Sequence, residues 1–217
     1  RGAVYLVCSL AFLLTARLTP PMSFRLVLAT RNSGKVQELR AKLDGLDVEI
    51  VTVDEFEHVP EVDEDQDTLA GNAKKKAMAV HQATGHPALA DDTGLEVYML
   101  DMKPGVHSAR FAGDTADDAA NRAKLISDLH GQDDRAARFR TVLAYADEGV
   151  VRLFEGSIEG AIAEAERGNG GFGYDALFQP DGHDHTFAEM DAATKNSISH
   201  RAQAVDKFAS FLRVQRS

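Results

Sequence analysis

Two adjacent carboxylates follow an apolar run in the segment Ala90-Asp-Asp-Thr-Gly94. Successive side chains of an extended chain point to opposite sides, so Asp91 and Asp92 need not share one role. Carboxylate oxygens are hard ligands that hold Mg²⁺ beside substrate phosphates, and a second carboxylate can take a proton from an attacking water. The alternative is a turn, with Asp92 as its cap and Gly94 supplying unusual backbone angles. Both interpretations stay open at this point.

A second candidate segment, Thr30-Arg-Asn-Ser-Gly-Lys35, joins an apolar run to a helical pattern. Backbone N–H groups and the helix dipole favour an anion at such a helix N-terminus, so the segment could cradle a phosphate. It is not a Walker A loop, because an upstream glycine is missing and Val36 stands where Ser or Thr would bind Mg²⁺. The alternative, which this segment in isolation favours, is a helix capped by Asn32 or Ser33 with a solvated Lys35.

The acidic segment 63–67 begins like an EF-hand calcium loop but does not continue as one. Thr68 replaces the required glycine and Lys74 the required glutamate. A solvated acidic loop is the default interpretation, and recruitment of one carboxylate to a metal is the alternative. In the helix predicted next, Lys76 lies nearest to the apolar stripe whereas Lys75 points away from it. Lys76 is therefore the lysine that we expect to reach a ligand.

The glycine-rich segment Gly168-Asn-Gly-Gly-Phe-Gly-Tyr-Asp175 could bring a backbone close to a planar ligand. Phe172 could stack on such a ligand, and base–aromatic stacking contributes ~1–3 kcal/mol. The alternative is a flexible hairpin loop whose Phe172 and Tyr174 pack into the core.

A last polar segment, Lys195-Asn-Ser-Ile-Ser-His-Arg201, leads into the final predicted helix. Lys195 could bind a phosphate, and Ser199, His200 and Arg201 could bind the edge of a base. With the phase of a single helix over 197–214, His200 points away from the apolar stripe. A lone histidine in that position is expected on the surface.

Strand and helix patterns alternate along the chain and predict an α/β fold. Strands are expected at 26–30, 47–53, 87–90, 95–100, 137–146 and 150–165. Helices are expected at 35–43, 68–84, 115–129 and 197–214. The sequence Asp147-Glu-Gly149 between two strands is typical of a hairpin turn.

Composition and charge exclude several classes of protein. The 217 residues are 44% hydrophobic and 27% charged, as in ordinary globular chains. A formal net charge of −10 argues against a nucleic-acid polymer as ligand, because such binding needs a basic face. The single cysteine, Cys8, cannot form an internal disulfide, which favours a reducing compartment such as the cytoplasm.

Residues 1–21 differ from the rest of the chain. Their apolar run, 3–14, is too short for the ~20 residues of a membrane-spanning helix, so no membrane anchor is expected. The run is similar to a signal-peptide core, but no small-x-small cleavage site follows it. We expect residues 1–21 to be a non-native or mis-called extension and residues 22–217 to form one domain.

Six motifs in order resemble the inosine/xanthosine triphosphate pyrophosphatase family. They are Thr30-x-Asn-x-Gly-Lys35, Asn72-Ala-x-x-Lys76, Ala90-Asp-Asp-Thr-Gly94, Pro104-Gly-Val-His-Ser-Ala-Arg110, Gly171-Phe-Gly-Tyr-Asp175 and Ser199-His-Arg201. The resemblance implies an α/β fold with a long central mixed sheet, flanking helices and two lobes around a substrate cleft. It also implies a homodimer and Mg²⁺-dependent hydrolysis of nonstandard purine nucleoside triphosphates (ITP, dITP, XTP) to monophosphate and pyrophosphate.

The same resemblance implies a role for individual residues. Asp92 would be the catalytic base, and Glu64 and Asp92 would serve the metal. The substrate-binding residues would be Thr30, Asn32, Lys35, Lys76, Thr93, Phe172, Tyr174, Asp175, Lys195, His200 and Arg201. The first three would hold the triphosphate with help from Lys76, and the last six would form the nucleoside end. Three departures from the family pattern, at Ala70-Gly71, His107 and Ala176, concern the pocket edge.

Hydrogen-bond polarity gives this family assignment a specific consequence. Arg201 has only donors, which suit O6 or N7 of hypoxanthine, and an ionised Asp175 could accept from N1–H. Adenine reverses both contacts. Two other functions remain as alternatives: a Maf-like pyrophosphatase for pyrimidine or modified nucleotides, and a nucleotide-binding regulator without turnover.

Overall fold

The computed structural model describes residues 24–115 and 117–215, so the extension expected at 1–21 lies outside the described residues. The strands are β1 (Phe24–Leu28), β2 (Val48–Thr52), β3 (Ala88–Val97), β4 (Lys103–Gly105), β5 (Ala136–Asp147), β6 (Val150–Ile162) and β7 (Phe178–Pro180). The α-helices are α1 (Ser33–Leu43), α2 (Leu69–Thr84), α3 (Asp118–Asp128), α4 (Ala192–Ile198) and α5 (His200–Gln215). Short 3-10 helices span Val53–Glu55, Tyr98–Leu100 and Ser108–Arg110.

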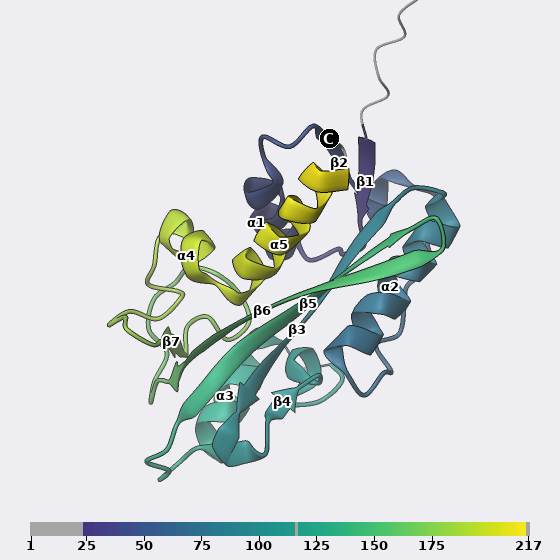
Figure 1. The fold of residues 1–217 in the computed structure, drawn as a ribbon. Coiled ribbons are helices and arrows are strands. Elements are labelled where there is room, and N and C mark those ends of the chain that lie inside the picture. Colours follow the sequence, from purple (N-terminus) through teal and green to yellow (C-terminus); the bar gives the residue numbers. More distant parts are fainter. Residues whose placement is uncertain (1–23, 116, 216–217) are drawn as a thin grey trace, which may run out of the picture.

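A mixed sheet runs through the whole molecule (Figure 1). Within the described residues it has seven strands in the order β2-β1-β3-β5-β6-β7, with β4 paired to β3. The pairs β1–β2 and β1–β3 are parallel, and the remaining pairs are antiparallel. The α/β fold with a long central mixed sheet and flanking helices is therefore confirmed.

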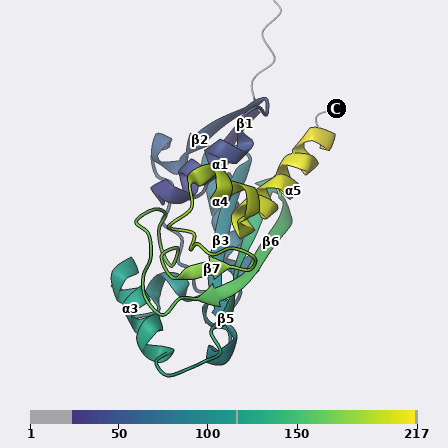
Figure 2. The same ribbon diagram turned by 90° about the vertical axis from the view of Figure 1, so that its left-hand side faces the viewer.

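Helices cover both faces of the sheet (Figure 1). On one face α2 packs on small side chains such as Ala90 and Ala144. On the other face α1 and α5 pack on larger ones such as Leu89 and Leu143. A third cluster joins α3 and β7 to the far ends of β3 and β5. In Figure 2 the loops between β6 and α4 lie between α3 and the pair α1 and α4.

The two carboxylates lie inside one continuous strand, which corrects the prediction of two strands around residues 91–94. All ten residues of β3 pair with β5, from Ala88 opposite Ala146 to Val97 opposite Ala137. This ladder excludes the alternative of a turn capped by Asp92. Residues 98–100 form a 3-10 helix rather than the end of a strand.

The helix cap expected at Asn32 is confirmed, and the next helix is capped at both ends. The Asn32 side chain accepts a hydrogen bond from the Lys35 N–H at the start of α1, and the Thr68 hydroxyl does so from Gly71 at the start of α2. Gly85 ends α2 in the left-handed region, at φ 68°. Glu148 and Gly149 both have positive φ in the turn that joins β5 to β6, as in a two-residue hairpin loop.

The C-terminal prediction was wrong in one respect. Instead of one helix over 197–214, α4 ends at Ile198 and α5 begins at His200. Ser199 between them is extended, and its hydroxyl accepts from the Ala202 N–H at the start of α5. The break resets the helical phase for His200 and Arg201. Within residues 24–115 and 117–215 the helices are too short or too polar to cross a membrane.

Candidate active site

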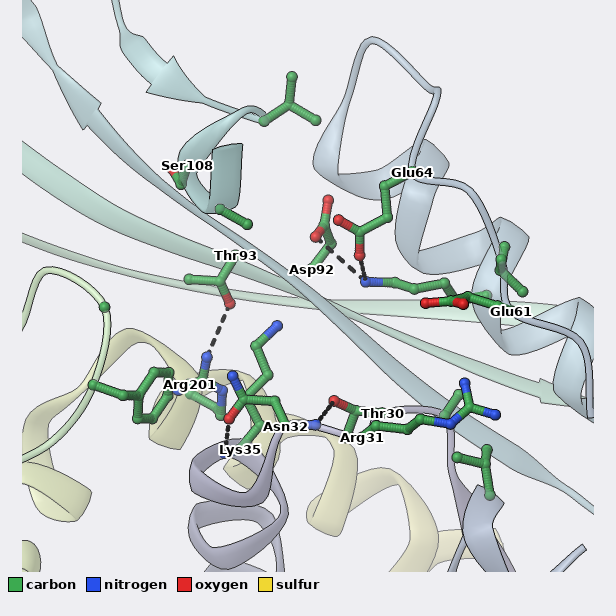
Figure 3. Close-up of a pocket in the computed structure, with 18 of the residues that line it drawn as sticks. Thr30, Arg31, Asn32, Lys35, Glu61, Glu64, Asp92, Thr93, Ser108 and Arg201 are labelled. Carbon is green, nitrogen blue, oxygen red and sulfur yellow. Dashed lines mark hydrogen bonds and ion pairs between the residues drawn. The ribbon is translucent and has the colours of Figure 1, made fainter. Parts of the chain in front are cut away.

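A cavity of about 340 Å³ opens beside β3, between the N-terminus of α1 and the helix α2. Five stretches of chain line it: 29–35, 59–64, 106–109, 172–175 and 200–201, together with Lys76, Asp92 and Thr93. Figure 3 shows the side chains of several of these stretches facing one another across the cavity. Every site residue predicted from the sequence except Lys195 lines this space.

Asp92 lies on the face of β3 that α2 covers. Its carboxylate accepts a hydrogen bond from the Asn72 side chain at 3.2 Å and lies 3.4 Å from the Lys76 ammonium. The same ammonium lies 2.5 Å from Glu64 Oε1 and 2.6 Å from the Asp91 carbonyl oxygen. In Figure 3 the carboxylates of Glu64 and Asp92 lie close together, and a dashed line joins each of them to the same ammonium.

Burial and charge act together on this group. Burial raises the pKa of Asp92 above its ordinary value, and Glu64 adds to the increase against the opposing charge of Lys76. Burial alone would lower the pKa of Lys76, but Asp92, Glu64 and the neighbouring Asp91 hold it above its ordinary value. Lys76 therefore stays an ammonium, and Asp92 is a stronger base than a solvated aspartate.

The acidic loop sends one carboxylate toward the cavity, while recruitment of that carboxylate to a metal stays a prediction. Asp63, Asp65 and Asp67 are exposed, whereas Glu64 is half-buried and faces the cavity. Lys75 holds the outer side of the loop by donating to the Asp63 carbonyl and to Asp65. The side chain of Lys75 is 37% exposed and that of Lys76 12%, so the predicted difference between the two lysines is confirmed.

Asp91 lies on the opposite face of β3, as strand alternation predicted. Its carboxylate is 3.1 Å from the Lys35 ammonium and 3.2 Å from Arg201 Nε. Burial alone would raise the pKa of Asp91, but Lys35 and Arg201 hold it well below its ordinary value. Lys35 is thus half-buried against Asp91. Of the alternative interpretation of this loop, the cap at Asn32 is correct and the solvated Lys35 is wrong.

Glu38 on α1 extends this charged network and is a residue that the sequence analysis missed. It binds the Lys195 ammonium at 2.7 Å and also pairs with Arg201. Lys195 in turn lies 2.6 Å from Asp175. Three acids and three cations therefore alternate from the glycine-rich loop to the phosphate loop, in the order Asp175, Lys195, Glu38, Arg201, Asp91 and Lys35. All six are buried or half-buried.

The glycine-rich loop is fixed from two directions. Gly173 donates its N–H to Asp118 at 2.7 Å and accepts at its carbonyl from Arg122 at 2.9 Å. The Tyr174 hydroxyl donates to the Ser108 carbonyl, and the ring packs in the core beside α3. Core packing thus applies to Tyr174, as one interpretation held, although the residue also lines the cavity.

Phe172 stays half-buried at the cavity, next to two cations. The Lys195 ammonium lies 5.0 Å and the Arg201 guanidinium 5.5 Å from the centre of its ring. Such contacts fix the ring by cation–π attraction. The ring is placed to present an aromatic surface to a ligand.

His200 corrects the sequence analysis, because it is 3% exposed rather than on the surface. Its ring stacks on Phe139 with centroids 4.6 Å apart. Burial, together with the charges of Arg201 and Lys195, lowers its pKa well below 6.5, so the ring is neutral. Its Nδ1 has no hydrogen-bond partner within the described part of the chain, although the residue lines the cavity. A buried polar atom without a partner calls for an explanation, and a ligand in the cavity that this residue lines would be one.

The donors around Lys76 fit a hard divalent cation. Glu64 and Asp92 offer carboxylate oxygens to one point, which already holds a positive charge. Mg²⁺ is commonly held by one or two carboxylates, with water and substrate phosphates completing its shell. Within residues 24–115 and 117–215 no group of three or more His, Cys, Asp or Glu side chains could hold a metal ion. The pair fits Mg²⁺ better than a metal that requires a full set of protein ligands.

Two further residues orient the carboxylates and had only weak signals in the sequence. Arg110 donates to the Glu64 carbonyl at 2.8 Å, and the fully buried Asn72 binds both Asp92 and the Gln66 N–H. Both belong to motifs quoted above, but neither had an assigned role. Glu38 had one signal: its position three residues after Lys35 places it on the same face of α1.

Known proteins resemble this chain over most of its length. A model of the Ham1 family matches residues 26–211. The chain is 53% identical over 186 residues to a dITP/XTP pyrophosphatase of Desulforamulus reducens, covering 84% of this chain and 92% of that protein. It is 51% identical over 189 residues to a dITP/XTP pyrophosphatase of Porphyromonas gingivalis, covering 87% and 97%.

Solved structures give the same result. A Ham1 protein from Coxiella burnetii has a TM-score of 0.81 at 38% identity, covering 88% of this chain and 98% of the other. The Ham1 protein of Staphylococcus aureus has a TM-score of 0.80 at 33% identity, covering 88% and 99%. With a matching family model over most of its length and relatives above 50% identity, this chain belongs to the Ham1 family.

Proposed function

We propose that this chain hydrolyses nonstandard purine nucleoside triphosphates, such as ITP, dITP and XTP, to the monophosphate and pyrophosphate with the help of Mg²⁺. Such an enzyme removes these nucleotides from the cellular pool. The relatives named dITP/XTP pyrophosphatase support the proposal. The observation that carries it is one cavity that holds a helix N-terminus with Lys35, the facing carboxylates Glu64 and Asp92, and the aromatic ring of Phe172.

The triphosphate is proposed to lie between the phosphate loop and α2. Thr30, Asn32 and Lys35 begin α1, where the helix dipole attracts anions, and Lys76 faces them from α2. The chain carries a net charge of −10 and a nucleoside triphosphate about four negative charges, so cations must be concentrated here for binding. The cavity supplies that concentration.

Asp92 is proposed to take the proton from the attacking water as the anhydride bond between the α- and β-phosphates breaks. Its raised pKa makes it the better base of the two adjacent aspartates, because Asp91 is held ionised by Lys35 and Arg201. Bound Mg²⁺, held by Glu64 and Asp92, would neutralise phosphate charge and acidify a water ligand. Asn72 keeps the Asp92 carboxylate in place.

The nucleoside is proposed to lie against Phe172. Arg201 uses three of its five N–H groups on Asp91, Glu38 and Thr93, which leaves two for O6 or N7 of hypoxanthine. His200, whose Nδ1 has no hydrogen-bond partner among the described residues, also lines the cavity. Lys195, Asp175, Tyr174 and Thr93 complete the assigned substrate-binding set. In the described structure Asp175 Oδ2 binds Lys195 and the Phe172 N–H, so Asp175 also shapes the glycine-rich loop.

Pyrophosphate release across a panel of triphosphates, with and without Mg²⁺, tests the proposal. We expect release from ITP, dITP and XTP with Mg²⁺, and slow release from ATP. Preferred release from pyrimidine or modified nucleotides would favour a Maf-like enzyme. Binding of triphosphate without any release in Mg²⁺ would favour a regulator.

We also propose that the protein is a homodimer and works in the cytoplasm. Exposed apolar side chains at Tyr98, Met99 and Met102 lie together at the end of β3 and support a contact with a second copy. The molar mass in solution, measured by light scattering, tests the dimer. A monomer at micromolar concentration would remove this part of the proposal.

A further inference from the structure

The contacts of the Lys76 ammonium indicate a role for it beyond phosphate binding. It lies among three oxygens from two segments of chain, Glu64 Oε1 at 2.5 Å, the Asp91 carbonyl at 2.6 Å and Asp92 Oδ1 at 3.4 Å. These are hard oxygen donors of the kind that Mg²⁺ prefers. Two of them are the carboxylates assigned to the metal, so Lys76 and a divalent cation compete for the same oxygens.

Charge shows why the competition matters. Glu64 and Asp92 carry two negative charges, and one of these is already balanced by Lys76. A divalent ion that entered beside the ammonium would bring the positive charge to three, against two negative charges on the carboxylates. The site is largely shielded from water. Repulsion between cations is strong in such surroundings. The metal is therefore favoured when the ammonium leaves or when more negative charge arrives.

We propose that Lys76 acts as a resident counter-cation that disfavours metal binding to the free enzyme, so that metal and triphosphate are taken up together. This inference rests on the proposed function, since it names the form in which the substrate is bound. A triphosphate in the same cavity would draw the ammonium toward its phosphates, and the flexible four-carbon stem of lysine permits that movement. The carboxylates would then be free for the divalent ion.

The coupling between the affinity for metal and the affinity for triphosphate must be reciprocal. If a triphosphate raises the affinity for metal by some factor, metal raises the affinity for the triphosphate by the same factor. Lys76 is the element that creates this coupling, and its neighbour Lys75 offers a matched control. Lys75 belongs to the same helix but pairs with the exposed Asp65 outside the cavity.

Mn²⁺ binding to the full chain, with free Mn²⁺ counted by electron paramagnetic resonance, tests the proposal without turnover. Wild type, Lys76→Met and Lys75→Met are compared, because methionine keeps most of the side-chain length without the charge. Without nucleotide we expect Lys76→Met to bind Mn²⁺ about ten-fold more tightly than wild type, within the usual range of coupling, and Lys75→Met to match wild type. Adding Glu64→Gln to Lys76→Met should remove the gain, which assigns the ion to this site.

The second arm uses an inosine triphosphate analogue with a methylene group between the α- and β-phosphates. It should raise the Mn²⁺ affinity of wild type about ten-fold and that of Lys76→Met much less. The wild type alone can already contradict the proposal where a variant folds poorly, as its melting temperature would show, whereas a gain is assigned to Lys76 only by the comparison with folded Lys76→Met. Wild-type affinity unchanged by the analogue, or folded Lys76→Met with wild-type affinity, would overturn the proposal.

The test of Lys76 and the test of the proposed hydrolysis can give different results. Pyrophosphate release without any change in Mn²⁺ affinity would support the proposed hydrolysis and contradict the proposed role of Lys76 as a counter-cation. If the Mn²⁺ affinity depends on Lys76 but no triphosphate releases pyrophosphate, the role of Lys76 as a counter-cation is supported and the proposed hydrolysis is contradicted. Inorganic triphosphate would then replace the analogue in the second arm.

Discussion

The two faces of β3 carry neighbouring aspartates in opposite electrical settings. On the α2 face Asp92 and Glu64 share one half-buried cation, Lys76, and the pKa of Asp92 is raised above its ordinary value by burial and by Glu64. On the α1 and α5 face Asp91 has two cations, Lys35 and Arg201, and its pKa is held well below its ordinary value despite burial.

The difference separates a reactive face from an orienting one. The α2 face keeps a surplus of negative charge, which suits a divalent ion and a base. The opposite face balances three acids with three cations, so its groups satisfy one another and hold Phe172 and the glycine-rich loop. Removing an acid should therefore affect catalysis on the first face and folding on the second.

Asp92→Asn should show the largest effect on rate. Loss of the proton acceptor should lower kcat by ~10²–10⁴, the usual range for a general base. The variant should fold, because burial already disfavours the charged form of Asp92. The checks are steady-state pyrophosphate release and urea denaturation. Turnover close to wild type would contradict the assignment of Asp92 as the base.

Asp91→Asn should show the largest effect on stability. The change leaves the Lys35 ammonium and the Arg201 guanidinium without their shared carboxylate, and breaking a buried ion pair costs about 3–5 kcal/mol. The free energy of unfolding from urea titration measures the loss, with Asp92→Asn as the control. If Asp91→Asn lowered kcat more than Asp92→Asn in folded protein, the two roles would have to be exchanged.

Arg201→Ala should reduce the selectivity for the base. Loss of its donors to O6 or N7 should lower kcat/KM for ITP by about 10–100-fold more than for ATP, as for a hydrogen bond from a charged group. Arg201 also pairs with Asp91 and Glu38, so a fraction of the variant molecules can be unfolded. The ratio of the two substrates is insensitive to that loss, because both are measured on the same sample. An equal decrease for both would assign Arg201 to the phosphates or the fold.

His200→Phe should change the pH dependence of stability by a smaller amount. The folded pKa of His200 lies well below 6.5, so the unfolded chain gains a proton that the folded chain resists. Stability from this residue is therefore present above pH 6.5 and is lost as the pH falls toward the folded pKa. Phenylalanine keeps the stack on Phe139 without titrating. The slope of the unfolding free energy between pH 6.5 and 5.5 should decrease by up to about 1.4 kcal/mol per pH unit. An unchanged slope would show that His200 titrates normally.

Local patterns predicted most of the helices and strands, because the apolar residues of a sufficiently long helix or strand recur with its own period. The spacing around Lys76 predicted its inward direction, and alternation predicted the opposite directions of Asp91 and Asp92; both are confirmed. The short elements β4, β7 and α4 were missed, since three to seven residues carry too little periodicity.

Long-range pairing decided what the sequence alone could not. The ladder between β3 and β5 makes residues 91–94 part of a strand, although their local sequence is also that of a turn. His200 is buried because Ser199 interrupts the helix and changes its phase, an effect that one continuous helical pattern hides.

By itself the sequence determined the element types, the direction of Lys76 and the two sides of the Asp91–Asp92 pair, because each depends on backbone geometry over a few residues. The tertiary structure decided which charges meet. Glu38 finds its partners Lys195 and Arg201 at separations of 157 and 163 residues, and no periodicity extends that far. Strong electrostatic coupling depends on distance in space and on burial, and both are set only when α5 packs against α1 and α4.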